Sequence, residues 1–316
     1  MAAGRGVRSV IGVIEVHELT KMYGAVAAVD NVSFRLEPGV INGFVGPNGA
    51  GKSTTMRMMV GLHRPTSGRC LIDGRPYPDL DAPLRSVGAL LDVETIHPGR
   101  SGRNHLRVLA RTHGIADRRA DELLEMVGLG DVGGRRVGGY SLGMRQRLGL
   151  AAALLGDPAA LLLDEPANGM DPDGIIWIRS LLRSLAREGR AVLVSSHLMG
   201  ELAQTADRLI VLGRGRVLAD APVVELISRN ATRTVHTRAD RPEELERVLR
   251  EHDSAVVRRP DGTLEITGMT VGDVAVLAQR TGILLLENVT VPASLEDAYR
   301  ALTQNHARHL GERLPQ

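Results

Sequence analysis

Residues 46–53 read Gly46-Pro47-Asn48-Gly49-Ala50-Gly51-Lys52-Ser53. The run fits the pattern G-x-x-x-x-G-K-[ST], which is typical of a phosphate-binding loop. Glycine reaches positive φ angles at little cost, so the backbone N–H groups of such a loop can turn inward around an anion. We expect Lys52 to reach the β- and γ-phosphates and the Ser53 hydroxyl to bind Mg²⁺. The loop therefore predicts a nucleoside triphosphate as the ligand.

The flanking sequence supports this interpretation. The apolar run Val40–Val45 before the loop indicates a buried strand, and the run Ser53–Leu62 after it indicates a helix that ends near Gly61. Strand, loop and helix thus come in the order that the motif requires. The positive end of the helix dipole adds to the anion site, and Thr54, in the first turn, joins the expected phosphate-binding residues.

The composition limits the classes of protein that fit. The chain has 316 residues, which suggests about two domains, and only 2% of them are aromatic, so aliphatic side chains must build the core. A net charge of +2 without a basic stripe argues against a nucleic-acid partner. The single cysteine, Cys70, excludes a disulfide framework and fits a reducing cytoplasm. We expect neither a signal peptide nor a membrane-spanning helix, so a membrane would be reached only through a partner.

The order of elements predicts the fold class. Apolar runs at 87–92, 159–165 and 190–197 indicate buried strands, and the runs 209–212 and 216–219 indicate a closing hairpin. Helical patterns, including one over the segment 101–128, alternate with these strands, which is the signature of an α/β sheet covered on both faces.

The pattern changes beyond about Arg229. The order strand, helix, strand, strand, helix, strand is that of a small α+β, ferredoxin-like unit, and Asp261-Gly262 is a strong signal for the hairpin between its middle strands. The sequence thus suggests an N-terminal extension (1–12), an α/β domain (13–228), a small C-terminal domain (229–306) and a C-terminal tail (307–316).

Two acidic residues follow the buried strand Leu161–Leu163. Ligands of open α/β sheets bind outside the carboxyl ends of the strands, so Asp164 is placed to hold Mg²⁺, directly or through water. Glu165, next along, can orient and deprotonate an attacking water.

Two further side chains allow a functional or a structural interpretation. His197 also follows a buried strand and can contact the γ-phosphate, although a lone histidine is more often structural. Ser141 has the features of a helix N-cap before a helix that runs to about Leu155. A capped helix N-terminus is a second surface for phosphate, or simply an ordinary helix start.

Together these motifs resemble the ATP-binding cassette (ABC) family over about residues 13–225. The matching pieces are Gly46–Ser53 (Walker A), Tyr140–Met144 (the signature), Leu161–Glu165 (Walker B), Asn168–Asp171 (the D-loop) and His197 (the switch histidine). The resemblance implies a P-loop NTPase with an antiparallel β subdomain and a helical subdomain. It also implies that Glu165 and His197 are catalytic, that Tyr23 stacks on adenine, and that ATP and Mg²⁺ are bound.

The resemblance further implies a head-to-tail dimer of two cassettes. ATP would lie between the Walker A of one copy and Ser141, Gly143 and Met144 of the other, with Asp171 in contact across the interface. ATP binding would close the dimer and hydrolysis would reopen it, which would drive a separate membrane permease at the cytoplasmic face of the membrane.

Two motifs depart from the usual family pattern. The signature reads Tyr-Ser-Leu-Gly-Met at 140–144 instead of Leu-Ser-Gly-Gly-Gln, a form that resembles exporter subunits of the bacterial drug, antibiotic and bacteriocin-immunity group. Asp92 stands at the Q-loop position, where glutamine or glutamate is usual, and Glu94 is the alternative in that loop.

Other members of the family are soluble ATPases of translation or DNA repair. Those of translation carry two cassettes in one chain, and those of repair carry coiled coils or zinc modules between Walker A and the signature. This chain has one cassette and neither insertion, and the intact Glu165 and His197 argue against a non-hydrolysing regulator. The C-terminal unit resembles the small domain of many exporter subunits, where we expect it to contact the dimer partner or the permease.

Overall fold

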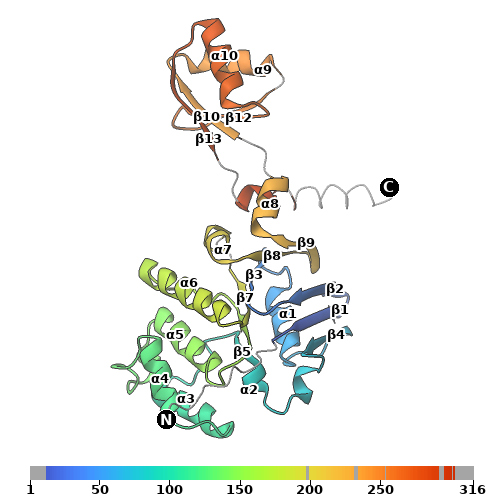
Figure 1. Ribbon diagram of the computed structural model, residues 1–316, viewed down its shortest axis with the longest axis vertical. Coiled ribbons are helices and arrows are strands. Elements are labelled where there is room, and N and C mark those ends of the chain that lie inside the picture. Colours follow the sequence, from blue (N-terminus) through green and yellow to red (C-terminus); the bar gives the residue numbers. More distant parts are fainter. Residues whose placement is uncertain are drawn as a thin grey trace, which may run out of the picture. The chain divides into compact units, whose positions relative to one another are not determined.

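The computed structural model describes residues 12–196, 199–230, 234–252, 254–291, 295–300 and 302. Contacts along the chain divide it into two compact units, Met1–Val223 and Val224–Gln316. Each unit has its own sheet and its own buried apolar core (Figure 1).

A six-stranded sheet forms the centre of the first unit. Its strands, in spatial order, are β5 (Val87–Leu90), β6 (Ala160–Leu163), β7 (Ala191–Ser195), β3 (Ile41–Val45), β8 (Arg208–Gly213) and β9 (Arg216–Pro222). The first five are parallel, and β9 pairs with β8 antiparallel, so the predicted hairpin is confirmed. Strands β3, β6 and β7 are buried along their whole length, which explains why their sequences are mostly apolar.

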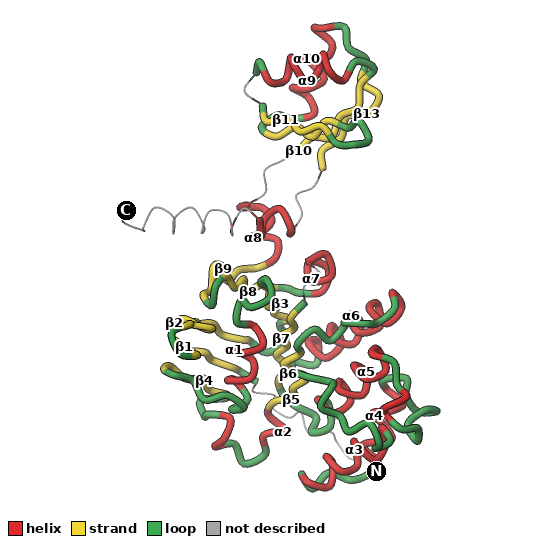
Figure 2. Tube along the Cα trace, turned by 180° about the vertical axis from the view of Figure 1, so that it is seen from behind, coloured by secondary structure: helices red, strands yellow, loops and turns green. Residues whose placement is uncertain are grey.

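Helices lie on both sides of this sheet, as the alternating pattern predicts. Helix α1 (Lys52–Met59) lies on the side of the antiparallel strands, whereas α5 (Leu142–Ala153) and α6 (Pro172–Arg187) lie on the other side (Figure 2). The short helix α7 (Met199–Thr205) packs against β3 and α6.

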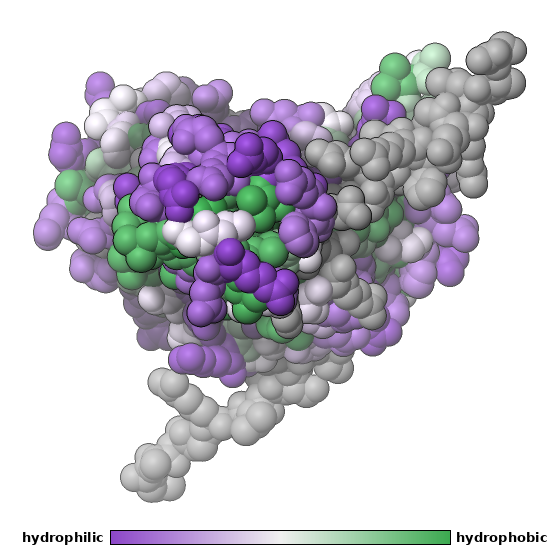
Figure 3. Space-filling view, turned by 90° about the horizontal axis from the view of Figure 1, so that it is seen from above, coloured by the Kyte–Doolittle hydropathy of each residue, from purple (hydrophilic) through white to green (hydrophobic). Residues whose placement is uncertain are grey.

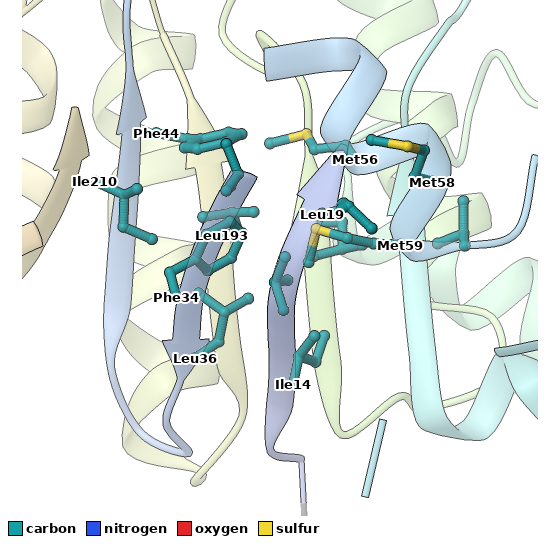
Figure 4. Packing of buried hydrophobic residues seen from close by; sticks show 14 of the residues in the cluster. Ile14, Leu19, Phe34, Leu36, Phe44, Met56, Met58, Met59, Leu193 and Ile210 are labelled. Carbon is teal, nitrogen blue, oxygen red and sulfur yellow. The ribbon is translucent and has the colours of Figure 1, made fainter. Parts of the chain in front are cut away.

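The antiparallel subdomain that the resemblance implies is a three-stranded sheet in the order β2 (Val26–Leu36), β1 (Ile14–Tyr23) and β4 (Ser67–Ile72). Its inner face meets the six-stranded sheet, and the ring centroids of Phe34 in β2 and Phe44 in β3 are 5.6 Å apart. Met56, Met58 and Met59 of α1 complete this core, with Met59 beside Leu19 of β1 (Figure 4). The core is therefore mostly aliphatic, as the composition predicts, with Phe34, Phe44 and three methionines added.

The helical subdomain divides the predicted helical segment 101–128 into two helices. These are α3 (Gly102–Thr112) and α4 (Arg118–Met126), with Gly114 at a φ of +65° between them. Asp121 of α4 accepts hydrogen bonds from Arg103 Nε at 2.7 Å and Arg107 at 2.9 Å, which ties the two helices together. Shorter elements of this unit are the 3₁₀ turns Tyr77–Asp79 and Val137–Gly139 and the helix α2 (Pro83–Ser86).

The second unit has the predicted element order. It follows α8 (Val223–Asn230) and consists of β10 (Thr234–Ala239), α9 (Pro242–Arg250), β11 (Ala255–Arg258), β12 (Leu264–Thr267), α10 (Val271–Thr281) and β13 (Leu285–Val291). The sheet order is β11-β12-β10-β13, and all pairs are antiparallel, including the β11–β12 hairpin around Asp261-Gly262. Residues 295–300 are helical.

Large apolar side chains remain at the surface of this unit. Val276 of α10 is 47% exposed and Leu286 of β13 is 63% exposed. The surface in Figure 3 accordingly mixes hydrophobic (green) and hydrophilic (purple) residues. None of the described helices combines the length and apolar character that crossing a membrane requires.

Candidate functional site

A cavity of about 630 Å³ lies where strands β3, β5 and β6 end, at the edge of the sheet where α/β proteins bind ligands. Its lining follows from this position, because each of the three strands delivers the residues that come directly after it. The lining comprises residues 28, 48–54, 57, 90–94, 142, 146, 164, 165 and 168.

The phosphate loop forms one wall of the cavity. Gly51 has a φ of +103°, and a Cβ there would lie 2.5 Å from the carbonyl oxygen of Ala28, so no other residue fits. Gly49, at a φ of +79°, faces open space. Helix α1 then starts without a side-chain cap or an acidic residue in its first turn. Its first N–H groups are therefore left for an anionic ligand.

Lys52 is the buried cation of this wall. It is 7% exposed, and its ammonium donates to the carbonyl oxygens of Gly46 at 2.6 Å and Pro47 at 3.3 Å. Ser53 and Thr54 line the cavity from the first turn of α1, next to Lys52. Of the predicted phosphate-binding residues, 48–54 line one end of the cavity without a gap. Gly46 and Pro47 are not part of the lining, and their carbonyls accept the hydrogen bonds of Lys52.

Asp164 and Glu165 form the opposing wall at the end of β6. The N–H of Asp164 donates to the carbonyl of Leu90 at 2.8 Å, which joins this wall to the end of β5. Glu165 has a φ of +50°, in the left-handed region that is costly for a residue with a side chain. Its carbonyl accepts from the N–H of Asn168 at 3.1 Å. The backbone turn thus brings both carboxylates to the cavity lining.

Asp92 also lines the cavity, as the sequence predicts for the Q-loop position. Its Oδ1 accepts from the N–H of Glu94 at 2.9 Å, so the side chain closes a local turn, and Glu94 lines the cavity as well. Asp92 and Glu94, the two candidates for the Q-loop position, therefore both line the cavity.

Two side chains at this site escaped the sequence analysis. Gln146 of α5 lines the cavity and is 5% exposed, and its Oε1 has no hydrogen-bond donor among the described residues. Ser195, the last residue of β7, donates a hydrogen bond to Asp164 Oδ1 at 2.5 Å. A serine at the end of the apolar run Ala191–Val194 is a signal that could have identified the second of them.

The donor set fits a magnesium–nucleotide site. The Ser53 hydroxyl and the carboxylates of Asp164 and Asp92 are hard oxygen ligands on the walls of one cavity. No group of three or more His, Cys, Asp or Glu gathers into a metal site within the described part of the chain. Mg²⁺ itself binds through one or two carboxylates plus phosphates and water rather than in a cage made only of protein.

The predicted adenine residue lies outside the cavity lining. Tyr23 ends β1 and is 50% exposed. Its hydroxyl shares a hydrogen bond with His63 Nδ1 at 3.1 Å, and Lys21 Nζ lies 5.2 Å from the centre of its ring. An exposed ring of this kind can stack on a base.

Most of the signature and D-loop residues also lie outside the lining, although Leu142 and Asn168 are part of it. Ser141 is the N-cap of α5, as predicted, because its hydroxyl accepts from the N–H of Met144 at 3.2 Å. Gly143 lies in the first turn of α5, close to the carbonyl of Gly169. Asp171 caps α6, with Oδ1 accepting from the N–H of Gly174 at 2.9 Å. These residues therefore do not complete the cavity of their own chain. His197 lies outside the described residues.

Two family models match the chain. One, described as "ABC transporter", matches residues 29–168, which include the phosphate loop, Asp164 and Glu165. The other, described as a domain of unknown function, matches residues 233–296.

Proteins named bacitracin transport ATP-binding protein BcrA are similar over most of the chain. The protein from Bacillus licheniformis is 42% identical over 221 residues, which cover 69% of this chain and 72% of the relative. The protein from Enterococcus faecalis is 34% identical over 295 residues, or 92% of this chain and 96% of the relative. The second similarity therefore includes the C-terminal unit.

A solved structure of an ATP-binding cassette has a similar fold. It is the dimeric ATP-binding cassette MJ0796 in a post-hydrolysis state bound to ADP and Pi. The TM-score is 0.61 with 26% identity, over 66% of this chain and 98% of the other.

Proposed function

The chain belongs to the ATP-binding proteins of ABC transporters, and from this premise we propose that it is the ATPase subunit of an antibiotic exporter. ATP binding closes a dimer of cassettes, and hydrolysis reopens it. This cycle drives a separate membrane permease that exports an antibiotic, a drug or a similar compound. The observation that supports the proposal is that residues 48–54, Asp164 and Glu165 line one and the same cavity.

The phosphate loop binds the triphosphate. Backbone N–H groups around Gly49 and Gly51 and the N-terminus of α1 surround the β- and γ-phosphates. Lys52, now hydrogen-bonded to loop carbonyls, has the reach and the charge to donate to phosphate oxygens. Burial of this cation strengthens each such contact, because water screens it little.

Ser53 and Asp164 are the residues that would hold Mg²⁺, and Asp92 lines the same cavity. The ion would neutralise charge that develops on the transferred phosphoryl group. Glu165 then orients the attacking water and accepts its proton. We also assign a role in hydrolysis to His197, on the sequence motif alone.

The second half of the nucleotide site comes from a second cassette. Ser141, Gly143 and Met144 are at the start of α5 and are not among the residues that line the cavity of their own chain, although Leu142 between them is, and this leaves them for use by a partner. The Ser141 hydroxyl accepts the N–H of Met144, and the N–H groups of Leu142 and Gly143 before it would meet a phosphate in trans. Asp171 would contact the partner, and Tyr23 would stack on adenine. We propose a homodimer on the cytoplasmic face of the membrane, attached through the permease.

The test is Glu165→Gln in the full chain. Glutamine keeps the shape of the side chain but cannot accept the proton, so the variant should bind ATP, turn over roughly 100-fold or more slowly, and accumulate as a closed dimer. Phosphate release and size-exclusion chromatography with ATP measure the two effects. Glu188→Gln, on the surface at the end of α6, is the matched control and should behave as the wild type. Normal hydrolysis by Glu165→Gln would refute the role of Glu165.

A further inference from the structure

Ser195 is a buried hydroxyl at the end of an otherwise apolar strand. It closes β7 after four aliphatic residues, and its exposed fraction is 0%. A hydroxyl buried without a partner costs free energy, so its hydrogen bonds are what make the position tolerable.

Both bonds of this hydroxyl go to the acidic wall of the cavity. Its hydrogen is donated to Asp164 Oδ1 at 2.5 Å, and its oxygen accepts from the backbone N–H of Glu165 at 2.9 Å. The parallel register explains the geometry, because Leu163 pairs with Val194, so the next residues of β6 and β7 are neighbours at the cavity edge. One side chain therefore holds two successive residues of the site.

Each bond restrains something that hydrolysis needs. The bond to Oδ1 fixes the orientation of the Asp164 carboxylate. The bond from the N–H stabilises Glu165 at a φ of +50°, a conformation that is costly in a residue with a side chain. The carbonyl of Glu165 is held separately by Asn168. Loss of the hydroxyl would free the carboxylate and one side of the turn together.

We propose that Ser195 is a positioning residue for Asp164 and Glu165. Its hydroxyl sets the carboxylate that receives Mg²⁺ and the backbone that carries the general base, without touching the nucleotide. The inference rests on the proposed function, because it presupposes those two roles.

The decisive variant is Ser195→Ala. Residues that orient metal ligands typically contribute 10- to 100-fold to metal affinity or activity, so kcat for ATP should fall by roughly this factor with little change in KM. A second readout avoids turnover: the Mg²⁺ concentration that half-maximally enhances binding of a fluorescent, non-hydrolysable ATP analogue should rise by roughly tenfold.

Two further variants separate positioning from stability. Ser195→Thr restores a hydroxyl on a β-branched side chain that suits a strand, and it should recover most of the activity. Ser195→Cys adds no methyl group, and it replaces Ser195→Thr if the extra methyl group of threonine unfolds the chain. Val194→Ala, in the same strand and 4% exposed, is the control that lowers thermal stability without removing a hydroxyl. It should leave the Mg²⁺ requirement unchanged.

The outcomes distinguish this inference from the proposed function. A wild-type chain that fails to hydrolyse ATP contradicts the proposed function. A wild-type chain that hydrolyses ATP, with Ser195→Ala equal to it in kcat and Mg²⁺ requirement, overturns the role of Ser195 alone. The role is also overturned if Val194→Ala raises the Mg²⁺ requirement as much as Ser195→Ala does.

Discussion

Single residues decide whether the cavity binds a triphosphate, and Lys52 is the sharpest case. Lys52→Ala removes the buried cation and leaves the carbonyls of Gly46 and Pro47 without their donor. A hydrogen bond to a charged group contributes about 1.5–3 kcal/mol, so ATP affinity should fall by roughly 10- to 150-fold. Titration with a fluorescent ATP analogue measures this loss.

Arg35→Ala is the control for Lys52→Ala, since it removes a cation from an exposed pair with Glu15. Exposed pairs contribute little, so its affinity should match the wild type. If Lys52→Ala binds ATP as tightly as Arg35→Ala does, the phosphate assignment is wrong.

The residues that sequence predicts best are those with a local reason for their identity. Gly51 is needed for its φ of +103° within the loop itself, and Ser141 for the N-cap of the helix that it precedes. Ser195 and Gln146 have no such local reason. The partners of Ser195 come directly after another strand, and Gln146 lines the cavity. Which residues meet there depends on the strand order β5-β6-β7-β3, which no short pattern encodes.

At the scale of the element, the N-terminus of α5 has a structural role as a capped helix start and a proposed role as a phosphate site for the partner cassette. Ser141→Arg removes the cap of α5, which costs about 1 kcal/mol, and places a bulky cation where a phosphate in trans would lie. The isolated chain should therefore bind ATP normally but fail to dimerise with ATP in the Glu165→Gln background. Equilibrium titration and analytical ultracentrifugation measure binding and dimerisation.

Ser101→Arg provides a matched comparison for Ser141→Arg. Ser101 caps α3 through the N–H of Asn104 at 3.3 Å, so this variant loses the same kind of cap on another helix. It should lower thermal stability by a similar amount and still dimerise. Loss of ATP binding by monomeric Ser141→Arg would contradict a role of Ser141 in trans.

Packing between α5 and α6 gives an element-scale prediction with an optical signal. Arg147 of α5 lies 4.5 Å over the ring of Trp177 in α6 and donates to the carbonyl of Val127 at 3.1 Å. Arg147→Ala should cost about 1–2 kcal/mol of stability and shift the emission of the only tryptophan. Arg187→Ala, in the last turn of α6, should leave the emission unchanged. An unshifted spectrum of Arg147→Ala would exclude this contact.

The elements themselves were predictable where their pattern is continuous. The buried strands β3, β6 and β7 are mostly apolar, with Asn42 and Ser195 as the polar exceptions, so their positions follow from the sequence within a residue or two. The segment 101–128 was predicted as helical without its break, because the glycine turn at Gly114 interrupts an apolar pattern that continues on both sides. Which helices cover which face of the sheet follows only from the strand order.

At the scale of the whole molecule, the cavity that we propose for the nucleotide is lined by described residues of one unit. All residues that line the cavity precede residue 169, whereas the apolar core of the second unit lies between Val235 and Ile283. A unit with its own core can fold alone. The separation was visible in the sequence as a change of pattern near Arg229, since a ferredoxin-like order of elements follows there.

A chain truncated after residue 230 should therefore keep its ATP affinity and lose only the unfolding transition of the second unit. It retains the phosphate loop, Asp164 and Glu165 with all the strands that position them. Circular dichroism melts and titration with a fluorescent ATP analogue check the two parts. Lys52→Ala in the truncated chain is the control, because it should lower the remaining affinity by roughly the same 10- to 150-fold. If truncation alone abolishes binding in a folded chain, the second unit contributes to the cavity, and the two units do not function separately.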